Sequence, residues 1–148
     1  MYKHHKVEAV FIFIVVAILS FLTDAAYKDM ALAALSVVTI SFAVYIAAMS
    51  ALLGSPYADR LKSVADEKIK TKSQLGVLNT YLRVAGKTSV LTIAISSLYQ
   101  FTSLKTNNVL FSRITSSLSC GVFALNILFL WLIFSFLSSA LINFAQKK

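Results

Sequence analysis

Residues 54–87 read GSPYADRLKSVADEKIKTKSQLGVLNTYLRVAGK and lie between long apolar segments. They contain seven of the 14 basic residues of the chain, namely Arg60, Lys62, Lys68, Lys70, Lys72, Arg83 and Lys87. Of the 148 residues, 58% are hydrophobic and only 14% are charged, whereas a soluble domain has about 25% charged residues. The composition therefore predicts an all-α integral membrane protein in which residues 54–87 form the one sizeable soluble surface.

Four apolar segments are predicted to span the membrane, because a spanning helix needs about 20 apolar residues. They lie at about residues 7–22, 30–53, 88–104 and 114–144, within a single membrane domain over residues 1–148. The first segment is short, so it must tilt or thin the bilayer locally. Its alternative is a cleaved signal peptide, because lysines precede it and a small-x-small sequence follows it at residues 23–25.

The residues Gly54, Ser55 and Pro56 mark the end of one helix and the start of the next. Glycine suits the left-handed conformation after a helix C-terminus, serine is a favoured N-cap, and proline is favoured at the first helical position. A helix is therefore predicted from Pro56 to about Lys72, and the third helix from about Leu75. Together these helices form a hairpin that extends the second and third spans.

An apolar stripe runs along the first helix of this hairpin, and mixed charge covers the remainder. Such a face suits a cytoplasmic protein partner, for which the predicted docking residues are Tyr57, Arg60, Leu61, Lys62, Val64, Lys68, Lys70 and Lys72. Two alternatives stay open: the bases hold anionic lipid, or they only fix the topology. Acids at positions 59, 66 and 67 lie among the bases, so we do not expect direct nucleic-acid binding.

The distribution of basic residues predicts the orientation. With four spans, one side of the membrane holds 11 Lys and Arg residues and the other holds three, which are Lys28, Lys105 and Arg113. The positive-inside rule then places both termini and residues 54–87 in the cytoplasm.

Small residues recur on the faces of two predicted spans. Thr39, Ala43, Ala47, Ala51 and Ser55 are spaced by four in the second span, and Ser117, Gly121 and Asn126 lie in the last. Such faces allow close helix approach, and a buried amide requires a partner. We predict a homo-oligomer packed through Ala43, Ala47, Ala51, Ser117, Gly121 and Asn126, with packing against the chain's own helices as the alternative.

The sequence lacks the side chains on which membrane enzymes and proton-coupled transporters depend. No acid lies in the middle of a span, and no HExxH, phosphate-loop or Cys-His cluster is present. Cys120 is the only cysteine, and the adjacent His4 and His5 lack a third ligand for a metal. We therefore expect no enzyme, no cofactor and no metal, although the serines and threonines of the third span leave an ion-conducting pore as an alternative.

The whole architecture resembles a class of small bacterial membrane proteins. Four spans, cytoplasmic termini and the basic hairpin LLGSPYADRLKSVADEKIKTKSQLGVLNTYLRVAGK resemble the membrane component of the Kiwa antiphage system, with the RexB-type phage exclusion proteins second. The first resemblance implies an inner-membrane oligomer that senses membrane perturbation and signals to a cytoplasmic effector. The second implies ion conduction that depolarises the cell.

We therefore expect a non-enzymatic sensor or scaffold of the bacterial inner membrane. Its expected partners are membrane lipid, further copies of the chain and a cytoplasmic protein effector. The alternatives are a holin-like or phage-exclusion channel, and an accessory subunit of a larger membrane complex.

Overall fold

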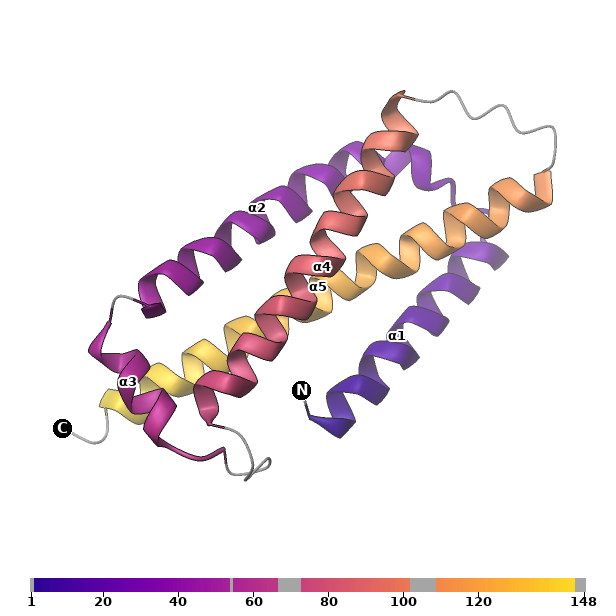
Figure 1. Cartoon of the computed structure of the whole chain (residues 1–148). Helices are drawn as coiled ribbons and strands as arrows, with labels where there is room; N and C mark the ends of the chain where they lie inside the picture. The colour runs from indigo at the N-terminus through magenta and orange to yellow at the C-terminus, as the bar shows by residue number, and fades with distance from the viewer. Residues whose placement is uncertain (1, 54, 67–72, 102–108, 146–148) are drawn as a thin grey trace.

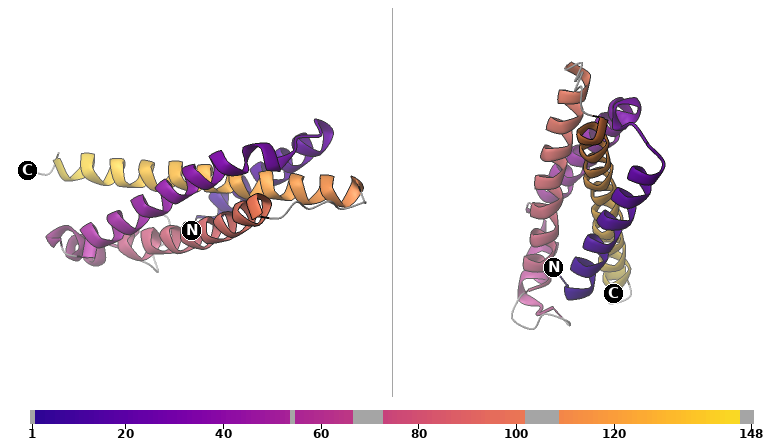
Figure 2. Two further views of the ribbon diagram at one scale, coloured as in Figure 1. Left: turned by 90° about the horizontal axis from the view of Figure 1, so that it is seen from above. Right: turned by 90° about the vertical axis from the view of Figure 1, so that its right-hand side faces the viewer.

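The computed structural model describes residues 2–53, 55–66, 73–101 and 109–145, and all regular structure in these residues is helical. The helices are α1 (Lys3–Leu22), α2 (Tyr27–Leu53), α3 (Pro56–Ser63), α4 (Gln74–Phe101) and α5 (Val109–Ala145) (Figure 1). Helices α1 and α4 run in one direction, and α2 and α5 run in the other. The short α3 therefore lies at the end of the bundle where α1 begins and α5 ends (Figure 2).

Three of the described helices are long and apolar enough to cross a membrane, over Lys3–Leu22, Tyr27–Ala51 and Val109–Ser139. Their outward surfaces carry large apolar side chains, such as Phe11, Ile40 and Trp131, each about two-thirds exposed at 66%. Hydrocarbon is a better solvent than water for so continuous an apolar surface. The three long helices and their apolar outer surfaces are thus those of a multi-pass membrane protein. Helix α4 is more polar, because it carries Arg83, Lys87 and several hydroxyls.

The long helices begin earlier in the chain than the apolar segments do. Helix α1 begins at Lys3, α2 at Tyr27 and α5 at Val109. Hydropathy marks only the part of a helix that suits hydrocarbon, whereas backbone hydrogen bonding continues into the polar residues beyond it. As a result Arg113, which lies before the predicted span at residues 114–144, is a residue of α5.

The amphipathic helix is shorter than predicted, because α3 ends at Ser63 and not near residue 72. Beyond it the chain folds back on itself. The amide of Gln74 donates to the carbonyl of Val64 at 3.1 Å, and Ala65 forms an isolated β-bridge with Ser73. These bonds take the place of the helical bonds that a continuous helix would form. The prediction for residues 67–72 falls outside the described residues.

The four long helices pack as two pairs, α1 on α5 and α2 on α4. The main contacts between the two pairs are those of α4 with α5. The inner face of α2 follows steps of three and four residues, as a helix requires, and consists of Tyr27, Ala31, Ala34, Val38, Ser41 and Tyr45. One apolar cluster near α3 surrounds Leu78, Tyr81 and Phe129, and a second surrounds Tyr27 and Cys120. Polar side chains of α4 and α5 lie between the two clusters along the helices.

Gly121 sets the distance between α1 and α5. A Cβ atom added there would lie 2.8 Å from the ring of Phe13 and 3.2 Å from the Phe13 carbonyl oxygen. The carbonyl belongs to the α1 backbone, so it cannot move aside without moving the helix. Gly86 of α4 differs, because an added Cβ would lie 3.8 Å from the ring of Phe42, an ordinary contact distance.

The two glycines therefore predict opposite effects of the same substitution. Gly121→Ala should destabilise the protein by about 1–3 kcal/mol, the usual cost of overpacking a close contact. Gly86→Ala should be neutral or stabilise it by up to about 1 kcal/mol, because alanine is favoured over glycine inside a helix. Unfolding of the purified protein in detergent measures both. Equal stability of the two variants would contradict the assigned contact between α1 and α5.

Candidate functional site

Side chains from three separate parts of the chain meet at the α3 end of the bundle. Tyr2 donates its hydroxyl to Oδ2 of Asp66 at 2.6 Å, and its amide donates to the hydroxyl oxygen of Tyr81 at 3.1 Å. The same Tyr81 oxygen lies 2.6 Å from Nδ1 of His5. We refer to Tyr2, His5, Asp66 and Tyr81 as the Tyr81 cluster. It attaches the N-terminal segment both to α4 and to the segment that follows α3.

The Tyr81 cluster is largely shielded from water, since Asp66 and Tyr81 are each 3% exposed. The rings of Tyr2 and His5 meet Tyr81 edge to face, with centroids 6.1 and 5.7 Å from its own. Burial raises the pKa of the Tyr81 phenol above its ordinary value of 10.0; the amide of Tyr2 opposes this, and the charges of Asp66 and Glu8 add to it. Tyr81 therefore keeps its proton, which it can donate to His5 while accepting from the Tyr2 amide.

The arrangement can transmit movement between α1, α4 and the segment that follows α3. Tyr2 immediately precedes α1, Tyr81 belongs to α4, and Asp66 follows α3. A shift of α1 against α4 would stretch the bonds of Tyr2 to both partners, which are 3.1 and 2.6 Å long and partly buried. Breaking a hydrogen bond costs about 1 kcal/mol, so such a shift favours a movement of Asp66 together with Tyr2.

The predicted docking residues fall into three groups. Leu61 is 4% exposed and holds α3 against the bundle, whereas Lys62 and Val64 face outward. Val64 is 48% exposed and follows the end of α3, so it does not extend the helical stripe. The side chains of Tyr57, Arg60, Lys68, Lys70 and Lys72 lie outside the part of the chain that the structure describes.

Asn126 lies at the centre of a polar layer between α4 and α5. Its Oδ1 accepts from Ser89 at 2.8 Å, and its Nδ2 donates to Thr92 Oγ1 at 2.6 Å and to the Val122 carbonyl at 3.1 Å. Thr92 in turn donates to the Thr88 carbonyl at 2.9 Å. Both the oxygen and the nitrogen of the amide thus have hydrogen-bond partners within one chain, and these bonds join α4 to α5. A water-filled pore would require these groups to face water instead.

The residues predicted for oligomer packing fall into a buried group and an exposed group. Ser117, Gly121 and Asn126 are buried inside the single chain, which corresponds to the alternative of packing against the chain's own helices. In contrast, Ala43, Ala47 and Ala51 are exposed on α2. The prediction of an oligomer contact therefore depends on these three alanines.

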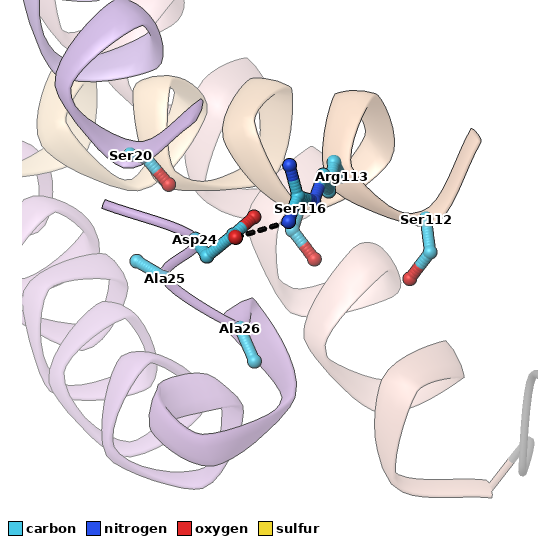
Figure 3. Close-up of a pocket in the computed structure, with 7 residues that line it drawn as sticks. All are labelled: Ser20, Asp24, Ala25, Ala26, Ser112, Arg113 and Ser116. Carbon is cyan, nitrogen blue, oxygen red and sulfur yellow. Dashed lines mark hydrogen bonds and ion pairs between the residues drawn. The ribbon is translucent and has the colours of Figure 1, made fainter. Parts of the chain in front are cut away.

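A small pocket of about 80 Å³ lies at the opposite end of the bundle, between the α1–α2 turn and α5 (Figure 3). Asp24 adopts a left-handed backbone conformation there, with φ 53°, and forms an ion pair with Arg113. Aspartate tolerates this conformation better than most residues. Ser20 and Ser116 also line the pocket. The ion pair connects the α1–α2 turn to the beginning of α5 and leaves the pocket without net charge.

Comparison of the chain with protein-family models, curated proteins and solved structures finds no match. Among the described residues, no group of three or more His, Cys, Asp or Glu side chains has an arrangement that could hold a metal. Function must therefore be argued from the geometry of the chain itself.

The Tyr81 cluster was not predicted from the sequence. In the sequence, Asp66 is one of the acids among the bases of the predicted helix, and His5 is one of two adjacent histidines that lack a third ligand for a metal. One available signal was the position of Tyr81 among Leu78, Leu82 and Ala85, because spacings of three and four place it on the buried face of α4. The partners of its hydroxyl could not be inferred, since they lie 76 and 79 residues away in the sequence.

Two tyrosines of the same apolar cluster allow a matched test. Tyr81→Phe should destabilise the protein by about 1–2 kcal/mol, because the Tyr2 amide loses its acceptor, and should increase cleavage by trypsin after Lys3 or Lys6. The Tyr45 hydroxyl is buried with no hydrogen-bond partner among the described residues, so Tyr45→Phe should cause no loss of stability. Similar destabilisation and similar cleavage in both variants would show that the Tyr81 bonds do not hold the N-terminal segment.

Proposed function

We propose that this protein is a non-enzymatic sensor or scaffold that docks a cytoplasmic protein effector. The observation that carries the proposal is the double attachment of Tyr2, to Tyr81 of α4 and to Asp66 beyond α3. A soluble surface that only solvated a loop would not need a bond to the residue before α1 that is itself bonded to α4. Fixed bonds instead suit a surface whose position reports the arrangement of the helices.

The proposal includes four membrane spans, with α4 as the third in sequence and the most polar. Its hydroxyls have partners that do not require water: Thr88 and Thr92 donate to carbonyls one turn earlier, Ser89 to Asn126, and Ser96 bonds the hydroxyl of Tyr27 at 2.7 Å. Hydroxyls satisfied in this way are tolerated in hydrocarbon. The hairpin of α3 and the start of α4 then extends the second and third spans into the cytoplasm.

The orientation and the setting of the proposal come from the sequence. One predicted side of the membrane holds 11 basic residues and the other holds three, which favours cytoplasmic termini and a cytoplasmic α3. The resemblance to the Kiwa membrane component favours a bacterial inner membrane and a part in antiphage defence. The exposed alanines at positions 43, 47 and 51 of α2 favour a homo-oligomer, because small residues let helices of two copies approach closely.

Cysteine labelling tests the proposed topology. In a Cys120→Ala background, a membrane-impermeant maleimide should label Lys28→Cys in intact cells with a permeabilised outer membrane. It should label Lys62→Cys only after the inner membrane is opened. Both positions are exposed in the structure, so a difference in labelling reports the side of the membrane. Labelling of Lys62→Cys in unopened cells would contradict the cytoplasmic placement of α3.

Neutralising the basic residues of the α3 segment tests the docking surface. Replacing Arg60, Lys62, Lys68, Lys70 and Lys72 with Gln should reduce partner recovery from cross-linked native membranes by about tenfold or more, equivalent to about 1.4 kcal/mol or more. Six basic residues would remain on that side against three on the other, so the topology should be kept. Quantitative mass spectrometry of the captured proteins provides the measurement.

The matched control neutralises bases on the same predicted side but outside the segment, by Lys3, Lys6, Lys147 and Lys148→Gln. This variant should retain the partner. If both variants keep the partner, or both lose it to the same extent, the bases of the α3 segment do not form the docking surface.

A further inference from the structure

We propose that a groove beside α3 binds an anionic phospholipid, with an acyl chain in the groove and the phosphate at its rim. The groove has a volume of about 480 Å³ and lies between the end of α2, α3 and the start of α4. This volume is within the range of about 300–1,000 Å³ typical of small-ligand sites. The site goes beyond the docking function proposed above, and it depends only on the membrane placement of α2.

The floor of the groove is apolar. Leu75, Leu78 and Leu82 of α4 line it, and the last two are almost completely buried at 1% and 5% exposed. These residues are spaced by three and four, so they form one continuous strip along α4. An apolar strip of this kind suits a hydrocarbon chain, which needs no hydrogen bonds and can move there from the bilayer at little cost, because lipid tails are about as apolar as leucine side chains.

One side of the groove opens at the level where α2 leaves the apolar region. Met49 lines the groove and is 38% exposed, and it belongs to Tyr27–Ala51, the part of α2 that is apolar enough to cross a membrane. A lipid can therefore enter the groove sideways from the bilayer.

The charge at the rim selects for an anionic headgroup. Lys62 of α3 is the only charged residue among the described residues that line the groove, and it is exposed. Asn79 lines the same groove from α4 and is also exposed, so its amide can donate to a phosphate. Arg83 follows Asn79 by one helical turn and is exposed as well. The ammonium group of Lys62 and the amide of Asn79, which both line the groove, match the phosphate of a negatively charged lipid.

Quenching by brominated lipids tests the site in the purified full-length protein, without any partner. In a Trp131→Phe background, Leu75→Trp places the single indole in the groove, and Met49→Trp provides a second probe if the first variant fails to fold. The proteins are reconstituted in phosphatidylcholine vesicles that contain a minor fraction of phosphatidylglycerol. Bromine is carried on the acyl chains of one lipid or the other.

We expect brominated phosphatidylglycerol to quench the indole as strongly as if this lipid were enriched about fivefold at the groove over random mixing. This factor corresponds to the attraction of one basic residue for an anionic lipid near the membrane surface. Unlabelled phosphatidylglycerol should compete for the site. Lys62→Gln should abolish the enrichment. Lys28→Gln, which changes the same residue type at the other end of α2, should leave it unchanged.

Equal quenching by the two lipids would overturn the proposal, and so would an enrichment that survives Lys62→Gln. Quenching below random mixing with both lipids would also overturn it, because the groove would then be closed to lipid and open only to a protein segment. None of these outcomes depends on the cytoplasmic effector, because the vesicles contain none. The docking variant also changes Lys62, so recovery of the partner with the single Lys62→Gln variant separates loss of the effector from loss of the lipid.

Discussion

The amide of Asn126 imposes the strongest constraint on this bundle. It lies in the middle of the apolar helix α5, where an unsatisfied amide would cost several kcal/mol in hydrocarbon. Ser89 and Thr92 of α4 occupy both ends of that amide, so the rotation and the register of α4 on α5 are fixed at this layer. The two apolar clusters on either side, and the contacts of α1 and α2 with this central pair, follow from that register.

The sequence was sufficient to predict the helical class and the approximate positions of the long helices, because hydropathy and length depend on neighbouring residues alone. It also predicted the helix start at Pro56 and the return of helix near residue 75. It did not predict the end of α3 at Ser63 or the Tyr81 cluster. Both depend on bonds between distant residues, such as Gln74 to Val64 and Tyr2 to Asp66, which no local pattern encodes.

The polar residues of α4 differ between the first and the second part of the helix. From Ser89 onward the buried hydroxyls of Ser89, Thr92 and Ser96 bond to other helices or to the preceding turn of α4. Before Ser89, Arg83 and Lys87 are exposed while Tyr81 bonds the N-terminal segment. The change occurs over about two turns, and it coincides with the change from the mixed to the apolar part of the bundle.

The pairing of α1 with α5 has a consequence for biogenesis. Helix α1 meets α5 at Gly121, and the ion pair of Asp24 with Arg113, 89 residues apart in the sequence, joins the turn after α1 to the beginning of α5. Helix α1 is therefore synthesised well before its packing partner. Its apolar surface can face lipid in the meantime, and the bundle can close only after α5 has left the ribosome.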